Sequence, residues 1–98
     1  MAAVTSILEL SPRAEYLTRI LYRAYLDKRE SGISRSESFA IGGIDYICGN
    51  LAGDLSQTDA EEASDELHSS NLIFKNLWGY IALKNDFVDF CENNFIKV

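Results

Sequence analysis

Residues 65–87, "DELHSSNLIFKNLWGYIALKNDF", decide which fold this chain adopts. Two short runs rich in isoleucine, leucine and aromatic residues, at positions 73–77 and 80–84, flank Trp78-Gly79. Such runs favour strands, and a glycine at a tight turn supplies the positive φ that a hairpin needs. The stretch therefore predicts the end of a helix, a two-strand hairpin, and a short final helix capped by Asn85 or Asp86.

An acidic amphipathic helix is expected immediately before the hairpin. Thr58 and Glu61 fit a capping box, in which each side chain bonds the backbone N–H of the other residue. Ala60, Ala63 and Leu67 recur at helical spacing and are expected to point inward. The outward positions are Glu61, Glu62, Asp65, Glu66, His68 and Ser69. This helix is therefore expected to turn its carboxylates toward solvent.

A longer helix is expected nearer the N-terminus. Ser11-Pro12 places a serine cap before a proline at the first helical position, and Ser31-Gly32 stops the helix after Glu30. Tyr22 and Leu26 lie outside its apolar stripe, so either residues 1–10 or a second copy of the chain is expected to cover them. Both are therefore candidate dimer contacts. The stripe itself consists of Ala14, Leu17, Ile20, Leu21, Ala24 and Tyr25.

The segment between these helices is interrupted by paired glycines. Ser34 and Glu37 fit a second capping box. Gly42-Gly43 weakens any helix that contains it, by about 1 kcal/mol for each glycine. We therefore expect an extended or irregular segment at residues 39–41 and a firm helix over residues 44–52, ended by Gly53. The apolar side of that helix would hold Ile44, Ile47, Cys48 and Leu51.

The order of these elements resembles that of the winged helix-turn-helix superfamily over about residues 12–92. In winged-helix regulators, a leucine late in the third helix precedes a Gly-Leu-Ile-like exit, the wing, and a strand leading into the last helix. Leu67, residues 71–73, residues 79–83 and residues 85–87 match those positions. Asn71 replaces the usual glycine, and asparagine tolerates the same left-handed conformation.

The resemblance implies a single α+β domain over residues 1–98. It would have a three-helix core, a two-strand hairpin wing and a short C-terminal helix, with a lead-in at residues 1–10 and a tail at residues 93–98. Residues 59–70 would be the helix that usually enters the DNA major groove. In this chain, that helix is acidic on its outward side.

Acidic side chains on a groove-reading helix argue against conventional DNA binding. Base and phosphate contacts use arginine, lysine, asparagine or glutamine. Each carboxylate facing a phosphate would be repelled by about 1 kcal/mol at contact distance in water. A small regulatory or adaptor protein, with a protein partner whose surface is basic, is therefore the favoured hypothesis, and a plain solvated surface is the simpler reading. The candidate partner-binding residues are Glu61, Glu62, Asp65, Glu66, Ser69 and Trp78.

The charge distribution leaves a DNA-binding alternative open. The net charge is −6, but residues 1–36 hold six Arg and Lys against four acids, while residues 37–98 hold three lysines against eleven acids. A winged-helix transcriptional regulator could contact DNA through its basic side chains. The candidates are Arg13, Arg19, Arg23, Arg29, Lys75 and Lys84. A structural subunit of a larger assembly is a third hypothesis.

The sequence offers no motif for catalysis, a cofactor or a metal. No nucleophile stands beside a base, and neither GxGxxG nor GxxxxGK[ST] surrounds Gly42-Gly43. His68 has no partners at metal-ligand spacing, so an exposed helix histidine is the simpler reading. Trp78 is expected either to cap the core or to form an exposed contact.

The two cysteines favour a reducing compartment. Cys48 and Cys91 belong to no CxxC pattern, and both are expected on apolar helix faces as buried thiols, with a disulfide as the alternative. No apolar run approaches the length of about 20 residues that spans a bilayer. The N-terminus lacks the basic start of a signal peptide. A cytoplasmic protein without a membrane partner is therefore expected.

Overall fold

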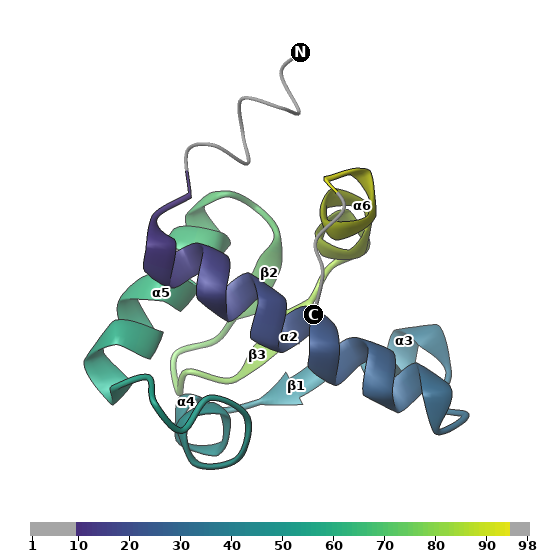
Figure 1. The fold of residues 1–98 in the computed structure, drawn as a ribbon, viewed down its shortest axis with the longest axis horizontal. Coiled ribbons are helices and arrows are strands. Elements are labelled where there is room, and N and C mark those ends of the chain that lie inside the picture. Colours follow the sequence, from purple (N-terminus) through teal and green to yellow (C-terminus); the bar gives the residue numbers. More distant parts are fainter. Residues whose placement is uncertain (1–9, 95–98) are drawn as a thin grey trace.

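The computed structural model describes residues 10–94 and has an α+β, winged-helix-like layout (Figure 1). Its antiparallel sheet has the strand order β1-β3-β2. The expected lead-in and tail fall largely outside the described residues. The elements are α2 (Pro12–Glu30), α3 (Arg35–Ser38), β1 (Ala40–Gly42), α4 (Ile44–Tyr46), the π-helical turn η1 (Ile47–Leu51), α5 (Gln57–Ser69), β2 (Ile73–Lys75), β3 (Ile81–Leu83) and α6 (Asn85–Asn93).

Helix α2 begins and ends where the sequence predicts. The Ser11 hydroxyl accepts a hydrogen bond from the backbone N–H of Ala14, and Pro12 occupies the first turn. At the other end, Gly32 has a φ of 90°, and Ile33 N donates to Lys28 O at 3.0 Å. The left-handed glycine thus closes the last turn and satisfies a carbonyl that the helix leaves free.

Tyr22 is buried, so the expectation that it lies outside the core was wrong. Its side chain is 9% exposed, and its ring lies 6.2 Å from that of Tyr25. The cause is α6, which packs against α2 and covers a side of it that helical spacing alone left uncovered. Leu26 is partly buried against the same core. Tyr22 therefore has little surface left for the predicted dimer contact.

The segment after α3 forms a third strand and an irregular helix. Ala40 pairs with Ala82 and Gly42 with Ile81, with an irregularity between the two pairs. Residues 39–41 were expected to be extended or irregular, and most of this segment is extended in β1. Its partner strand lies about 40 residues later in the chain, so the local sequence could not show that it pairs in a sheet. The helix predicted over residues 44–52 is a short α-turn followed by the π-turn η1.

Two predicted caps are displaced by one or two residues. Helix α5 is capped by Ser56, whose hydroxyl accepts from Asp59 N at 3.1 Å, and not by Thr58. The cap residue of α6 is Lys84, which makes no side-chain cap hydrogen bond, while Asn85 and Asp86 already lie in the first turn. Asn71 has a φ of 67°, which confirms its left-handed conformation after α5.

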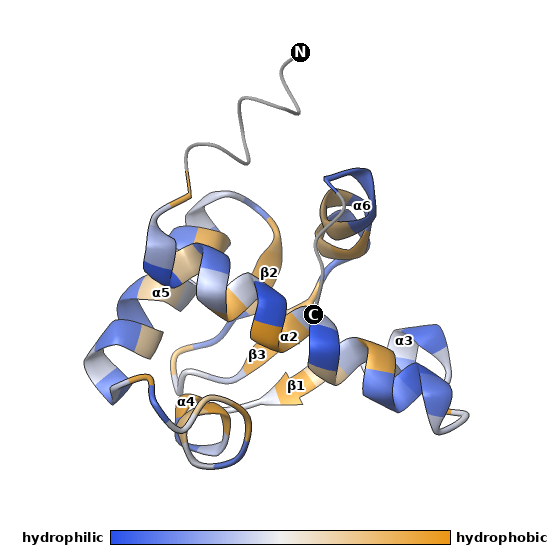
Figure 2. Cartoon of the chain, viewed as in Figure 1, coloured by the Kyte–Doolittle hydropathy of each residue, from blue (hydrophilic) through white to orange (hydrophobic). Residues whose placement is uncertain are grey.

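The core lies between α2, α5, α6 and one face of the sheet. Figure 2 shows apolar residues on β1, β3 and the inner parts of the helices, and hydrophilic residues on the outer turns. Leu17 and Leu67 are fully buried where α2 packs against α5, and Ile73, Ile81 and Phe87 are fully buried beside them. Burial of each such side chain contributes about 1.5–3 kcal/mol.

Glu66 links α5 to the start of α2. Its Oε2 accepts from Ser11 N at 2.7 Å, and its Oε1 accepts from the Ser11 hydroxyl at 2.7 Å. Glu66 was expected to face solvent, which was wrong, because it is half-buried against the amino-terminal end of α2. A carboxylate is favourable there, since free backbone N–H groups and the helix dipole give that end positive character.

We predict that Glu66→Ala lowers the free energy of unfolding by about 1–3 kcal/mol, because two hydrogen bonds to a charged group are lost. Urea unfolding followed by circular dichroism at neutral pH measures the loss. Glu62→Ala is the matched control: Glu62 forms an exposed ion pair with Arg13, which contributes less than about 1 kcal/mol. Equal losses in the two variants would contradict the structural role of Glu66.

Candidate functional site

The turn between β2 and β3, residues 76–80, is organised by Asn76. Its Oδ1 accepts from Trp78 N at 2.9 Å and from Tyr80 N at 3.0 Å. Its backbone also exchanges hydrogen bonds, with Asn76 N donating to Tyr80 O and Gly79 N donating to Asn76 O. Asparagine side chains commonly form turns of this kind, a signal that the sequence interpretation did not use. These hydrogen bonds define the conformation of the turn, which is referred to below as the wing tip.

Gly79 allows the wing tip to lie close to α4. Its φ is 80°, which confirms the positive φ expected at this position. A Cβ atom on this residue would lie 3.3 Å from Cγ1 of Ile44. Both the backbone conformation and the close contact therefore favour glycine here.

Two large apolar side chains project from the wing tip. Leu77 is 97% exposed and Trp78 is 85% exposed. Of the two roles expected for Trp78, the structure thus shows the exposed one and not a cap on the core. Leu77 and Trp78 thus project into solvent from a turn whose backbone is hydrogen-bonded.

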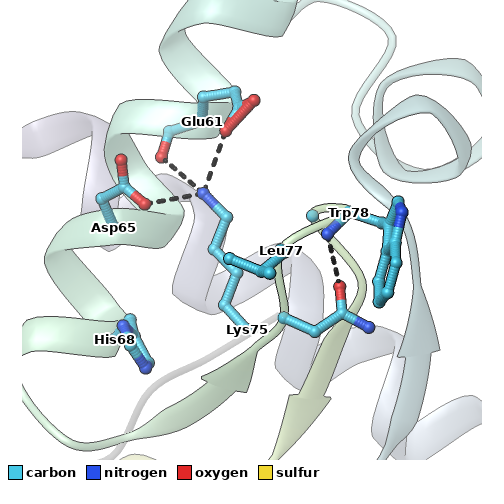
Figure 3. A pocket seen from close by; sticks show the side chains of 8 residues that line it. Glu61, Asp65, His68, Lys75, Leu77 and Trp78 are labelled. Carbon is cyan, nitrogen blue, oxygen red and sulfur yellow. Dashed lines mark hydrogen bonds and ion pairs between the residues drawn. The ribbon is translucent and has the colours of Figure 1, made fainter.

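Lys75 joins the wing to α5 through two carboxylates. Its Nζ lies 2.7 Å from Asp65 Oδ1 and 3.0 Å from Glu61 Oε1, and it also donates to the backbone oxygen of Glu61 (Figure 3). Burial lowers the pKa of Lys75, but the hydrogen bonds to Asp65 and Glu61 raise it more, so the net shift is upward. The group therefore stays an ammonium.

A shallow hollow of about 370 Å³ lies between α5 and the wing tip. Positions 61, 65 and 68 follow one another along a single side of α5 and form one wall. Figure 3 shows Glu61 and Asp65 pointing from α5 toward Lys75, with the wing tip opposite. The lining residues are Glu61, Asp65, His68, Lys75, Asn76, Leu77, Trp78 and Gly79. Four predicted contact residues meet here: Glu61, Asp65, Lys75 and Trp78.

The other predicted partner-binding residues lie outside this hollow. Glu62 pairs with Arg13, which also lies 3.1 Å from Asp59 Oδ1. Hydrogen bonds to Glu62 and then to Asp59 raise the pKa of Arg13. Glu66 bonds Ser11, and Ser69 is exposed. With five carboxylates on α5 and two cations, Arg13 and Lys75, paired to them, the α5 surface keeps a net charge of 2 − 5 = −3.

The basic residues considered for DNA contact all have partners within the chain. Arg19 pairs with Glu15, and Arg23 pairs with Asp27, as their spacing of four residues predicts. The remaining four have partners in other parts of the chain. Arg29 donates to Ile33 O, Lys84 donates to Asn71 Oδ1 and lies over the Phe74 ring, and Lys75 and Arg13 bond α5 as described above.

The cysteines and the single histidine form no reactive cluster. Burial raises the pKa of the Cys91 thiol to about 12, and burial also raises the pKa of half-buried Cys48. Both thiols are free, and a raised pKa keeps them protonated and unreactive. His68 is exposed. Between residues 10 and 94, His, Cys, Asp and Glu side chains do not gather in any group of three able to hold a metal.

Within the same described range, every helix is too short or too polar to cross a bilayer. Comparison of the chain with protein-family models, with curated proteins and with solved structures found no match. The candidate site is therefore defined by its own geometry.

We predict that Gly79→Ala destabilises the protein by about 1–2 kcal/mol, because alanine is strained at positive φ and its methyl group meets Ile44. Gly49→Ala is the control, since a Cβ at Gly49 has no heavy atom within 4 Å, and it should be neutral or stabilising. Thermal unfolding of the two variants measures the difference. A Gly79→Ala protein as stable as the Gly49→Ala protein would show that the wing tip does not depend on this glycine.

Proposed function

We propose that this chain is a small, non-enzymatic regulatory or adaptor protein that binds a protein partner through the acidic face of α5 and the wing tip. The observation that carries the proposal is the exposure of Leu77 and Trp78 on a hydrogen-bonded turn, beside Glu61 and Asp65. Tryptophan is enriched among the residues that dominate protein–protein binding energy, and here it projects from a hydrogen-bonded turn.

The hydrogen-bonded turn makes the exposed side chains suitable for binding a partner. Asn76 fixes the turn before any partner arrives, so little backbone entropy is lost when a partner covers Leu77 and Trp78. Each side chain can bury most of its apolar surface at once. Exposed apolar groups that lie together mark interaction sites on soluble proteins.

The surrounding charge narrows the class of partner. The α5 surface keeps a net charge of −3, which repels phosphates of nucleic acid and anionic lipid alike. A protein surface that offers both cations and apolar side chains matches the wing tip and the carboxylates together. We therefore place a basic protein ahead of DNA or a membrane as the partner.

The winged-helix scaffold supports a regulatory role by resemblance. Helix α5 holds the position that usually reads the major groove, and its charge is the opposite of what DNA requires. We propose that the same face now serves a protein. Cys48 and Cys91 are free thiols, which fits a reducing cytoplasm as the location. Self-association remains a separate proposal, with Leu26 as the better-placed of its two predicted contacts.

We predict that combining Leu77→Ser and Trp78→Ser abolishes recovery of the partner when the tagged protein is purified from its native host. The substitutions remove the two apolar side chains that contribute most to the binding free energy. Because both positions are exposed to solvent, the substitutions should leave the stability of the fold almost unchanged. Phe74→Ser is the matched control: Phe74 is 58% exposed on β2 but alternates with Lys75 and so faces away from the hollow. If the double variant recovers the partner as well as the Phe74→Ser protein does, the proposal fails.

We also predict that the protein has no duplex-DNA affinity above that of a charge-matched acidic control protein at physiological salt. Fluorescence anisotropy with a labelled duplex, titrated at low and high salt, tests this. Affinity that falls steeply with salt and disappears in a variant with Arg19→Glu and Arg23→Glu would favour the DNA-binding alternative. Their pairing with Glu15 and Asp27 is the physical reason to expect the negative result.

A further inference from the structure

The apolar wing tip and the carboxylates of α5 border the same hollow, so one short segment of a partner can reach both. Leu77 and Trp78 line it from the wing, and Glu61 and Asp65 line it from α5 (Figure 3). Its volume of about 370 Å³ suits a few side chains rather than a complete helix or a strand pair. A partner can therefore contact the hollow with only a few of its side chains.

Lys75 shows how a cation is held at this place. Its ammonium reaches one oxygen of each carboxylate, Oε1 of Glu61 and Oδ1 of Asp65. The carboxylate side chains remain 51% and 67% exposed, whereas that of Lys75 is only 9% exposed. Two negative charges thus share one positive charge, and the carboxylates remain accessible from the solvent side. A second cation from outside would complete the neutralisation.

We infer that the partner inserts a short peptide segment in which an arginine adjoins a large aliphatic residue. The arginine pairs with Asp65 and Glu61 from the solvent side, and the aliphatic side chain packs on Leu77 and Trp78. Arginine suits the site better than lysine because its planar fork can bond two carboxylate oxygens at once. The inference rests on the proposed docking function and specifies what that function recognises.

The chain contains its own reporter for this binding. Trp78 is the single tryptophan of the sequence and is 85% exposed. An aliphatic side chain packed on the indole replaces water and shifts its emission to shorter wavelength. Fluorescence titration of the whole protein therefore measures occupancy of the wing tip directly, with no label added.

The probe is a capped hexapeptide made of two Arg-Leu repeats flanked by glycine. Two matched peptides replace either both arginines by citrulline, which keeps the shape and removes the charge, or both leucines by serine. We expect the Arg-Leu peptide to bind about tenfold more tightly than either control, since each control loses one of the two contacts. Its affinity should fall as salt rises.

Two variants locate the binding on the protein. Asp65→Asn should weaken the Arg-Leu peptide about fivefold to tenfold while leaving the citrulline peptide unaffected. Asp89→Asn, an exposed aspartate on α6 that does not line the hollow, should change neither affinity. Because both positions are exposed, both variants should remain folded, and circular dichroism checks this.

Several outcomes overturn the inference. Three results would contradict the inferred pairing of a partner arginine with Asp65 and Glu61. They are equal affinity for the Arg-Leu and citrulline peptides, no binding at millimolar peptide, and an unchanged affinity in Asp65→Asn. A blue shift with phosphatidylcholine vesicles but not with the peptide would assign the wing tip to a lipid surface. If the Leu77→Ser and Trp78→Ser variant still loses the cellular partner while the peptide fails, the docking function stands and only this recognition rule is wrong.

Discussion

The packing of α5 against α2 determines where the residues of the candidate site lie. Leu17 of α2 and Leu67 of α5 are both fully buried, and Glu66 bonds Ser11 at the start of α2. With α5 fixed in this way, only one side of the helix can face the wing. The carboxylates of Glu61 and Asp65 on that side pair with Lys75, and the three residues line the hollow beside the wing tip.

The sequence predicted those elements whose ends are determined by neighbouring residues, such as helix caps and turn glycines. The serine before Pro12 and the glycine after Ser31 set the ends of α2, and the glycine of the wing turn set the hairpin. The winged-helix-like order of elements followed from these. The cap of α5 was predicted wrongly at Thr58, because serine and threonine are both good cap residues and the structure uses Ser56 two positions earlier.

Features that depend on distant partners could not be obtained in the same way. Strand β1 exists because β3 lies beside it, and Tyr22 is buried because α6 covers a second side of α2. At the candidate site, the sequence analysis named Glu61, Asp65 and Trp78 as partner contacts, and all three line the hollow, but it placed Lys75 with the DNA-contacting residues and Glu66 with the solvent-facing acids. Pairing across two elements decides both positions, and spacing along one helix does not contain that information.

The exposure of Leu77 and Trp78 also bears on how free molecules of this protein behave toward each other. Two such tips would gain apolar contact by meeting, yet each carries carboxylates alongside it and belongs to a chain with a net charge of −6. Like-charge repulsion opposes that homotypic collision at low ionic strength. The carboxylates beside the wing tip therefore disfavour self-association through Leu77 and Trp78, and under the proposed function they leave these side chains free to bind a basic partner.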